Sequence, residues 1–572
     1  MSETTTQKGH PKGLWFLFGT EMWERFGYYL MLGIFALYML DGWNNGGMGF
    51  DAHTKSDIYG TYLGLVYLTP FIGGLLADRV LGYRRSIIMG GLMMAAGYFL
   101  LSIHDITTFF AGLGLIILGN GFFKPNISTL VGNLYSSDEL KHKKDSGYNI
   151  FYMGINVGAF VCNFVAAYMR INFGWNFAFI AAGVGMLIGV VIFLSGTKHI
   201  KHVDVIKPLQ EGDMPTGKIL GSTILPMFVF GILGYLIPDN LLGSDTNDAF
   251  ILGCVPVIAF FIYLWFKSSG LEKRAIAALL AVFSCVILFF AIFHQNGDAL
   301  TVWAEDYTDR EMPESVATVF NKVDMAQTVE NNDIVALDEP AFKAKIEELR
   351  AANNAMPEAT ETEMAAKKAS AKEIAKLESS RKYFSNLAAE KVPAKGKDLK
   401  LYSTELYQSI NPFWVIVLTP VLVGIWTALR KKGKEPSTPT KIALGLLITA
   451  LSALVMVGAV YATNDLTMKA GSWWLLASYG VITLGELCLS PMGLSLVSKL
   501  SPPRITALMM GGFFLAISVG NKLAGMLSSL WEDMEQKENF FFLNFALVLV
   551  AALLLFLMLK WLNRVMKENN VF

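Results

Sequence analysis

The stretch Glu21-Met22-Trp23-Glu24-Arg25-Phe26-Gly27-Tyr28-Tyr29 places three charged residues inside an apolar segment that runs from about residue 14 to residue 40. At about 3.6 residues per turn, one face of a helix would carry Glu21, Glu24, Arg25, Tyr28 and Leu32. A charged side chain at the centre of a bilayer costs about 2.5–3.5 kcal/mol, so these groups need a partner or a wet cavity. Taken alone, the stretch also fits a structural ion pair that locks helices together.

The composition places the chain in a lipid bilayer. Of its 572 residues, 53% are hydrophobic and only 16% are charged, and the mean hydropathy is positive, which is too apolar for an ordinary water-soluble protein. A formal net charge of +0 argues against nucleic acid as a partner. The four cysteines lie in apolar segments without metal-site or disulfide spacing, which indicates small buried side chains: Cys162, Cys254, Cys285 and Cys488.

Fourteen segments are long and apolar enough to cross a membrane, because a span needs roughly 20 apolar residues at about 1.5 Å per residue. The predicted fold class is therefore an all-α membrane protein with 14 transmembrane helices. The approximate limits are 14–40, 57–80, 85–103, 107–133, 147–170, 174–195, 218–238, 248–267, 275–303, 411–430, 440–461, 472–499, 504–530 and 539–563.

The charge asymmetry between loops predicts the orientation, because Lys and Arg are enriched in loops that stay in the cytoplasm. One side is basic after the second, fourth and tenth predicted spans, with Arg79, Arg84, Arg85, Lys141, Lys143, Lys144, Arg430, Lys431, Lys432 and Lys434. The short loops of the other side carry Asp41, Asp51, Asp57, Asp239, Asp245, Glu532, Asp533 and Glu535. We expect a multi-pass protein of the inner membrane with both termini in the cytoplasm.

A polar segment between about residues 304 and 408 interrupts the pattern and falls on the external side. Asp338 can cap a helix that has Pro340 in its first turn, and Pro357 separates it from a second helix over about Thr360–Lys391. An apolar stripe on the second helix predicts an antiparallel hairpin: Ile374, Leu377, Phe384 and Leu387. The insertion is either a solvated or membrane-resting appendage or a docking site for an extracytoplasmic partner.

Two further charges lie deep in apolar segments. Lys124 directly precedes Pro125, and Glu486 lies shortly before Pro491. We expect both prolines to interrupt their helices, and charged groups beside broken helices in both halves of a chain indicate a binding site near the bilayer midplane. The glycines of Phe151–Gly158 permit close helix approach, and packing alone explains them at least as well as function does.

The junction Gly74–Arg85 resembles the cytoplasmic signature of the major facilitator superfamily. In that superfamily the acid and the following cations form a conformational latch, which implies gating roles for Asp78, Arg84 and Arg85. Three other motifs resemble the proton-dependent oligopeptide transporter family: Glu-x-x-Glu-Arg-Phe-x-Tyr-Tyr at Glu21–Tyr29, Phe-Tyr-x-x-Ile-Asn-x-Gly at Phe151–Gly158 and Gly-Glu-x-x-x-Ser-Pro at Gly485–Pro491.

This resemblance implies a major facilitator fold of two six-helix bundles with two extra helices between them, as bacterial members have. The expected parts are an N-terminal bundle at 1–197, a linker with the extra helices at 198–274, the first helix of the C-terminal bundle at 275–303, an extracytoplasmic helical insertion between core helices 7 and 8 at 304–408, and the rest of the C-terminal bundle at 409–572.

The resemblance also implies where a peptide would bind. Its amino group would lie near Asn156, Asn411 and Glu486, and its carboxylate near Arg25 and Lys124. Aromatic side chains would line the pocket, namely Tyr28, Tyr29, Tyr67 and Phe513, the last standing where relatives often have tryptophan. Two poles of opposite charge would recognise a zwitterion without selecting its side chains.

Two positions depart from the family pattern in a way that concerns proton coupling. Leu32 stands where most members have an arginine, and His294-Gln295-Asn296-Gly297-Asp298 stands where most have Glu-Gln-x-Gly-Ser. Losing both charges avoids leaving one buried alone. We hypothesise that His294 replaces the missing acid, with Asp298 one helical turn away as its partner, because histidine titrates near pH ~6.5; a structural histidine is the alternative. The other proton-coupling candidates are Glu21, Glu24 and Arg25, and the two acids would face Lys124.

The implied function is proton-coupled import of di- and tripeptides by alternating access, with protons as the coupling ion and no other cofactor. The partners would be small peptides, protons and the lipid bilayer. An enzyme is not expected, because the sequence has no Ser-His-Asp or metal-ligand constellation and no nucleotide-binding loop. Two alternatives stay open: a transporter of another anion or zwitterion, such as nitrate or a modified amino acid, and a non-transporting receptor or scaffold. Glu486 argues against a simple anion.

Overall fold

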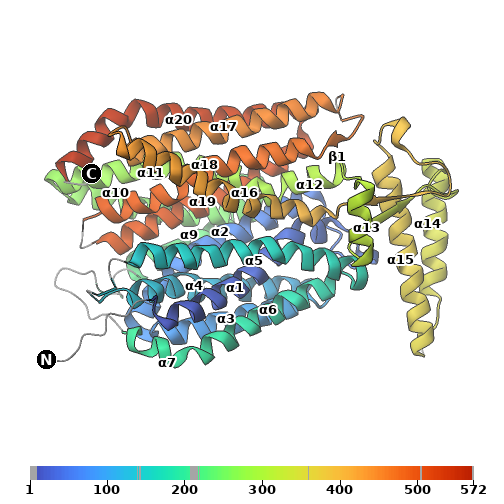
Figure 1. Cartoon of the computed structure of the whole chain (residues 1–572), viewed down its shortest axis with the longest axis horizontal. Coiled ribbons are helices and arrows are strands. Elements are labelled where there is room, and N and C mark those ends of the chain that lie inside the picture. Colours follow the sequence, from blue (N-terminus) through green and yellow to red (C-terminus); the bar gives the residue numbers. More distant parts are fainter. Residues whose placement is uncertain are drawn as a thin grey trace.

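The structure, a computed structural model, is a long bundle of helices with a smaller lobe at one end (Figure 1). It describes residues 9–137, 139–140, 143–205, 215, 217, 220–358, 360–464, 466–502 and 505–569, so the two termini themselves and Lys141 lie outside the described residues. The lobe is the insertion. We call its end of the bundle the insertion end and the opposite end, where the first helix begins and the last one finishes, the terminal end.

Six helices form what we call the N bundle: α1 (Lys12–Leu40), α2 (Ala52–Leu76), α3 (Tyr83–Leu101), α4 (Ile106–Leu134), α5 (Lys144–Phe173) and α6 (Trp175–Ser195). Their apolar side chains share one core that runs from Leu14 to Val203. Small residues let the backbones meet closely, since a Cβ on Gly119 of α4 would lie 2.6 Å from the Gly90 carbonyl of α3.

A linker follows, with α7 (Thr197–Ile200), η4 (Lys201–Val203), η5 (Leu220–Ile224), α9 (Leu225–Tyr235) and α10 (Asp245–Lys267). Helices α9 and α10 pack mainly on each other, and α10 also touches α2 and α19. Large apolar side chains of α9 face outward, including Leu225, Phe228 and Ile232, as expected of a helix in contact with lipid.

The second group, the C bundle, contains α11 (Gly270–Phe293), η6 (His294–Gly297), α12 (Ala299–Asp306), α16 (Ile410–Lys431), α17 (Thr438–Ala462), α18 (Trp473–Leu500), α19 (Thr506–Asp533) and α20 (Lys537–Glu568). Its core is separate from that of the N bundle. All four cysteines are buried and free, as predicted.

Among the described residues, eleven helices are long and apolar enough to cross a membrane. They confirm a multi-pass helical membrane protein. The other three predicted spans fall on α1, α3 and α9. Helix α1 carries the charged stretch, and the apolar helix that contains α9 is short, at Gly221–Tyr235. The count of fourteen spans therefore stays a prediction.

The expected helix breaks at Pro125 and Pro491 are wrong, because α4 and α18 each continue through their proline. A proline removes only one backbone hydrogen bond, and helix neighbours in a membrane protein can make up for it. The real irregularities lie elsewhere, at the π-helical turn η2 (Ala77–Leu81) after α2 and at the tight turn η6 between α11 and α12.

The insertion contains the predicted antiparallel hairpin, α14 (Glu339–Asn354) and α15 (Glu361–Phe384). Asp338 caps α14 as expected, and Thr360 with Glu363 forms a capping box at α15. The second helix ends at Phe384 rather than near Lys391. Two small sheets were not predicted: β1 (Thr308–Asp309) pairs with β4 (Ala470–Gly471), and β2 (Gln327–Glu330) pairs with β3 (Asp398–Leu401).

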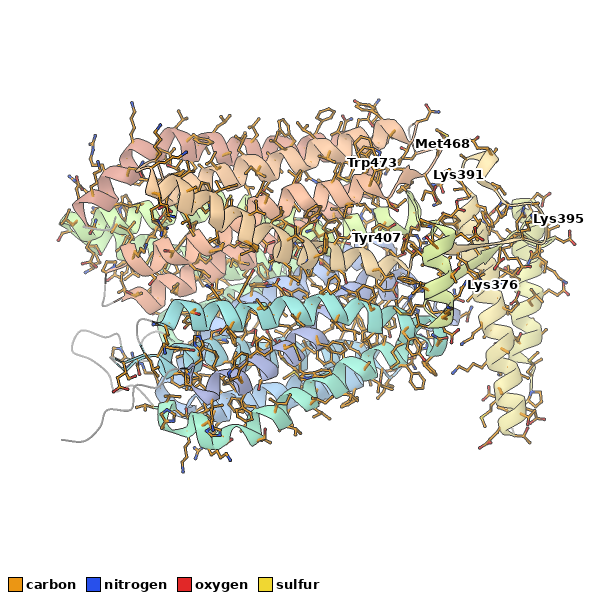
Figure 2. All side chains as sticks on the ribbon, viewed as in Figure 1. Lys376, Lys391, Lys395, Tyr407, Met468 and Trp473 are labelled. Carbon is orange, nitrogen blue, oxygen red and sulfur yellow. The ribbon has the colours of Figure 1, made fainter. Side chains whose placement is uncertain are left out.

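The remaining short elements are η1 (Trp43–Asn45) after α1, and α13 (Glu314–Lys322), η7 (Ala389–Lys391) and η8 (Thr404–Ser409) in the insertion. Figure 2 shows Lys376, Lys391 and Lys395 on the lobe, beyond the end of the bundle that carries Met468 and Trp473. The predicted stripe is internal to the lobe, since Ile374 and Leu377 are buried against Phe342 and Ile346 of α14. The insertion therefore has a hydrophobic core of its own.

Candidate functional site

Three charged side chains of α1 are buried together in the N bundle. Glu21, Glu24 and Arg25 are at most 3% exposed. Arg25 donates two hydrogen bonds to Glu24, one of them 2.7 Å long from Nη2 to Oε1, and its Nε lies 3.2 Å from Glu21 Oε1. Two carboxylates on one guanidinium leave a negative charge, and Lys124 of α4 is close enough to interact electrostatically with both acids. The buried charges thus form one cluster.

Lys124 also faces an aromatic side chain. Its Nζ lies 4.0 Å from the centre of the Tyr67 ring, which is favourable for a cation. The ring of His294, in η6 of the C bundle, lies 5.6 Å from the same tyrosine ring. Tyr67 therefore joins the cationic group of the N bundle to the helix break of the C bundle.

The predicted pairing of His294 with Asp298 is wrong. The helix ends at Phe293 and Asp298 leaves helical geometry, so the two residues are not one turn apart on a continuous helix. His294 Nδ1 lies 3.4 Å from the Phe290 carbonyl. Asp298 is fully buried and forms an ion pair with Lys55 of α2, a residue that the sequence analysis did not single out.

An acidic pole lies in the C bundle. Asn411 at the start of α16 donates a hydrogen bond from Nδ2 to Glu486 Oε2 at 3.1 Å and lies 2.8 Å from the Thr483 hydroxyl. The amide orients the Glu486 carboxylate and still leaves it acceptor capacity. The predicted partners Asn411 and Glu486 are thus brought together.

Tyrosines link the acidic pole to the cationic one. Tyr29 and Tyr67 each interact electrostatically with both Arg25 and Glu486. Arg25 of the N bundle and Glu486 of the C bundle therefore share two tyrosine neighbours. Tyr28 is 2% exposed and packs edge-on against Tyr29, with ring centres 5.2 Å apart.

Tyr152 of α5 is a third tyrosine near the acidic pole, because it interacts electrostatically with Glu486 and Tyr67; it is 42% exposed. It was not predicted as a site residue, although it lies in the Phe-Tyr-x-x-Ile-Asn-x-Gly motif. Asn156, expected near the peptide amino group, donates instead to the Tyr152 carbonyl at 2.9 Å. Phe513 is 1% exposed and packs in the core of the C bundle beside Phe283.

The two bundles are joined by polar contacts at the insertion end. Lys522 of α19, itself fully buried, binds Asp57 of α2 at 2.6 Å. Here the C bundle supplies the cation and the N bundle the acid, whereas in the Lys55 and Asp298 pair the N bundle supplies the cation. Asn163 of α5 donates to the Ser409 hydroxyl at 3.1 Å. These contacts hold the insertion end closed. Lys522 was not predicted, although it is a cation within an apolar segment, as Lys124 is.

The motif that was predicted to act in gating lies at the terminal end. Asp78 is part of the π-helical turn η2, and Arg85 is exposed at the start of α3. Asp204, in the linker after η4, accepts hydrogen bonds from the backbone N–H groups of Tyr83 and Arg84 at 2.9 and 3.3 Å. This linker aspartate was not predicted, and it ties the start of α3 to the segment that follows α6.

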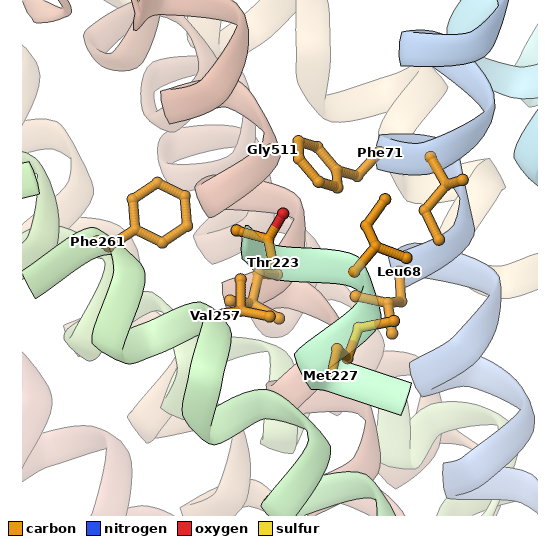
Figure 3. Close-up of a pocket in the computed structure, with 10 residues that line it drawn as sticks. Leu68, Phe71, Thr223, Met227, Val257, Phe261 and Gly511 are labelled. Carbon is orange, nitrogen blue, oxygen red and sulfur yellow. The ribbon is translucent and has the colours of Figure 1, made fainter. Parts of the chain in front are cut away.

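A separate, small apolar pocket lies where the linker helices meet both bundles (Figure 3). Its walls come from α2, η5, α9, α10 and α19: Leu68, Phe71, Ile72, Thr223, Ile224, Met227, Val257, Phe261, Gly511 and Leu515. It holds none of the charged site residues. No cluster of three or more potential metal ligands occurs among the residues that the structure describes.

Comparisons with known proteins agree with this architecture. The family model described as the POT family matches residues 84–329 and 390–543. A di-/tripeptide transporter of Lactococcus lactis subsp. lactis is 27% identical over 574 residues, covering 98% of this chain and 97% of the relative. A peptide transporter of Yersinia enterocolitica is 28% identical, with 98% and 96% covered.

Solved structures give the same result. The crystal structure of a POT peptide transporter in complex with sulfate superimposes with a TM-score of 0.73 at 29% identity, covering 98% of this chain and 97% of the other. A POT peptide transporter in complex with alafosfalin gives a TM-score of 0.72 at 28% identity. Because the family model covers well over half of the chain, this chain belongs to the POT family, the proton-dependent oligopeptide transporters.

Proposed function

We propose that this chain imports di- and tripeptides together with protons by alternating access. The observation that carries the proposal is that the cationic pole at Arg25 and Lys124 shares Tyr67 with the acidic pole at Glu486. A peptide zwitterion needs an acceptor for its ammonium group and cations for its carboxylate, and charge-assisted hydrogen bonds are the strong ones. The sequence relatives named as di-/tripeptide transporters support the same substrate class.

The chain would lie in the inner membrane with both termini in the cytoplasm, so that the insertion end faces outward. The closed insertion end then corresponds to a state in which the outer entrance is shut. One proton that enters across 100 mV releases about 2.3 kcal/mol, which is enough for roughly fifty-fold accumulation of a neutral solute. A single coupled proton is therefore adequate for concentrative uptake.

Uptake of a labelled dipeptide into proteoliposomes tests the proposal. With an inward proton gradient imposed, the peptide should accumulate above its external concentration, and a proton uncoupler should abolish the accumulation. Glu486→Gln should reduce uptake by at least about tenfold, because a charge-assisted contact to the ammonium group is lost. Glu361→Gln, at an exposed position at the start of α15, is the matched control and should leave uptake unchanged.

The same vesicles separate the alternatives. Uptake of labelled nitrate without uptake of the dipeptide would indicate an anion transporter, and saturable dipeptide binding without uptake would indicate a receptor. Either result contradicts the proposed import. An extracytoplasmic protein partner at 304–408 stays a prediction, and a cross-linking pull-down that recovers nothing specific would remove it.

A further inference from the structure

The insertion is fixed firmly to the C bundle at its base. Strand β1 pairs with β4, which lies between α17 and α18, and Lys469 donates to the Asp306 carbonyl at 2.6 Å. Arg310 is 1% exposed, contacts Glu305 at 3.1 Å and donates to the Tyr402 carbonyl at 2.9 Å. The insertion follows α12 and precedes α16, so both ends of the insertion are also connected to the C bundle.

The same insertion reaches across to the outer ends of α1, α5 and α6. Asn45, just after α1, donates to Glu378 Oε2 of α15 at 3.1 Å. Asn172 of α5 donates to the Asp324 carbonyl at 2.8 Å, and its own carbonyl accepts from Lys372. Lys368 lies 5.7 Å from the ring of Phe177 in α6. The lobe thus spans the boundary between the bundles (Figure 1).

The two sets of contacts differ in kind. The base uses a buried arginine and backbone pairing, which are costly to break without replacement. The contacts of the lobe with Asn45, Asn172 and Phe177 are polar or cation–π and largely solvent-exposed, and such contacts are individually weak and readily reversible. When the bundles separate at the insertion end, the lobe will therefore stay with the C bundle and leave the N bundle.

We propose that the insertion is a latch across the outer entrance, which stabilises the closed insertion end through Asn45, Asn172 and Phe177 and must release them in every transport cycle. The proposal rests on the alternating access proposed above. At the base of the insertion, Arg170 of α5 binds Ser403 and also Glu405 of η8, so the insertion makes one buried contact with the N bundle below the latch. Weakening the latch should shift the population toward the state that is open at the insertion end.

Distance measurements between spin labels test the population shift without any transport assay. Labels at Thr107→Cys in α4 and Met468→Cys beside β4 report the separation of the bundles at the insertion end, and both positions are exposed. The four native cysteines are buried and free, which favours selective labelling. Lys368→Gln with Lys372→Gln should raise the long-distance population at least about threefold, since small free-energy changes shift such equilibria.

The matched control is Lys343→Gln with Lys345→Gln on α14, where both lysines pair within their own helix. This control should leave the distance distribution as in the unsubstituted chain. Equal distributions in the latch variant, the control and the unsubstituted chain would overturn the proposal.

A covalent test locks the latch. In Asn45→Cys with Glu378→Cys, a short bismaleimide should join the N bundle to α15 and abolish peptide uptake, while each single-cysteine variant treated in the same way keeps its uptake. Undiminished uptake by the cross-linked protein would overturn the latch. If the untreated double variant and the unsubstituted chain both fail to take up peptide, the proposed function is wrong, and the spin-label distances still decide whether the insertion is a latch.

Discussion

At the scale of single residues, the Lys55 and Asp298 pair shows how a buried charge can join the two bundles. Lys55 comes from α2 and Asp298 from the break between α11 and α12, and both are at most 2% exposed. Ser56 adds its hydroxyl 3.5 Å from Asp298 Oδ1. A buried pair is weak evidence for stability, but one buried partner left alone is strongly destabilising.

We therefore expect Asp298→Asn to destabilise the folded protein more than the double change Lys55→Met with Asp298→Leu. The single change leaves a buried ammonium group without its counter-charge, which costs ~3–5 kcal/mol, whereas the double change removes both charges. Thermal unfolding in detergent checks this order. If the single and double variants unfold at the same temperature, Lys55 and Asp298 do not compensate each other.

The proton-coupling role of His294 needs a separate test, because its predicted partner is engaged elsewhere. His294→Gln should reduce the pH dependence of peptide accumulation if the imidazole carries the coupled proton, while Gln295→Asn is a control at the next position. Accumulation with an unchanged pH profile in His294→Gln would refute that role and leave Glu21 and Glu24 as the candidates.

The residue scale also shows what a sequence can reveal. The cluster of Glu21, Glu24 and Arg25 was predictable, because ionised groups in an apolar helix must find partners. The partner of Asp298 was not, because Lys55 lies in a polar stretch before the apolar part of α2, and the pairing spans 243 positions of sequence. Phe513 was assigned to the pocket because relatives often have a pocket tryptophan there, and its position in the core depends on packing that the sequence does not show.

At the scale of elements, α2 and α19 carry the closest approach between the bundles. A Cβ on Gly60 of α2 would lie 2.9 Å from the Gly525 Cα and 3.1 Å from the Lys522 carbonyl. Both neighbours are backbone atoms, which cannot turn away as a side chain can. Closure of the insertion end therefore depends on a glycine at position 60.

Gly60→Leu should keep the insertion end open, since its side chain has no room between α2 and α19. Spin labels at Thr107→Cys and Met468→Cys should then report mainly long distances. Gly114→Leu, in α4, is the control, because a Cβ there would meet nothing within 4 Å. Short distances in Gly60→Leu, as in the control, would contradict the packing argument.

The loop between α17 and α18 allows a prediction about pH. Burial, followed by the nearby charge of Arg310, lowers the pKa of Lys469 from 10.5 to about 8. The unfolded chain therefore binds more protons between about pH 8 and 10.5, so the contribution of this group to stability rises with pH across that window. Lys469→Met should lose this rise in thermal unfolding, whereas the exposed control Lys431→Met should keep it; equal slopes in both would contradict the assignment.

Element boundaries were predictable where their causes are local in the sequence, and not where they depend on distant parts of the chain. The hairpin α14 and α15 was predicted because caps, proline positions and an apolar stripe are local signals. The prediction of helix breaks at Pro125 and Pro491 was wrong, because neighbouring helices determine whether a proline interrupts a membrane helix. The pairing of β1 with β4 joins two-residue strands that are far apart in sequence. Strands this short carry no recognisable hydrophobic pattern in the sequence.

At the scale of the whole molecule, each of the two bundles contributes one group of buried polar side chains to the proposed site. Arg25 and Lys124 belong to the N bundle, and Asn411 with Glu486 belongs to the C bundle. A ligand that binds both poles at once draws the bundles together, so its binding free energy can drive the change between states. The insertion adds a second link between the same bundles at the outer entrance.

The most direct test of this account is competition for uptake by dipeptides that are blocked at one end. In the unsubstituted chain, an N-acetylated dipeptide should compete at least about tenfold more weakly than the free dipeptide. In Glu486→Gln that difference should largely disappear, because the acidic pole is already lost, while Lys124→Gln should keep it and lose instead the penalty for a C-terminally amidated dipeptide. If the acetyl penalty in Glu486→Gln equals that of the unsubstituted chain, Glu486 does not bind the peptide amino group, and the two-pole account is wrong.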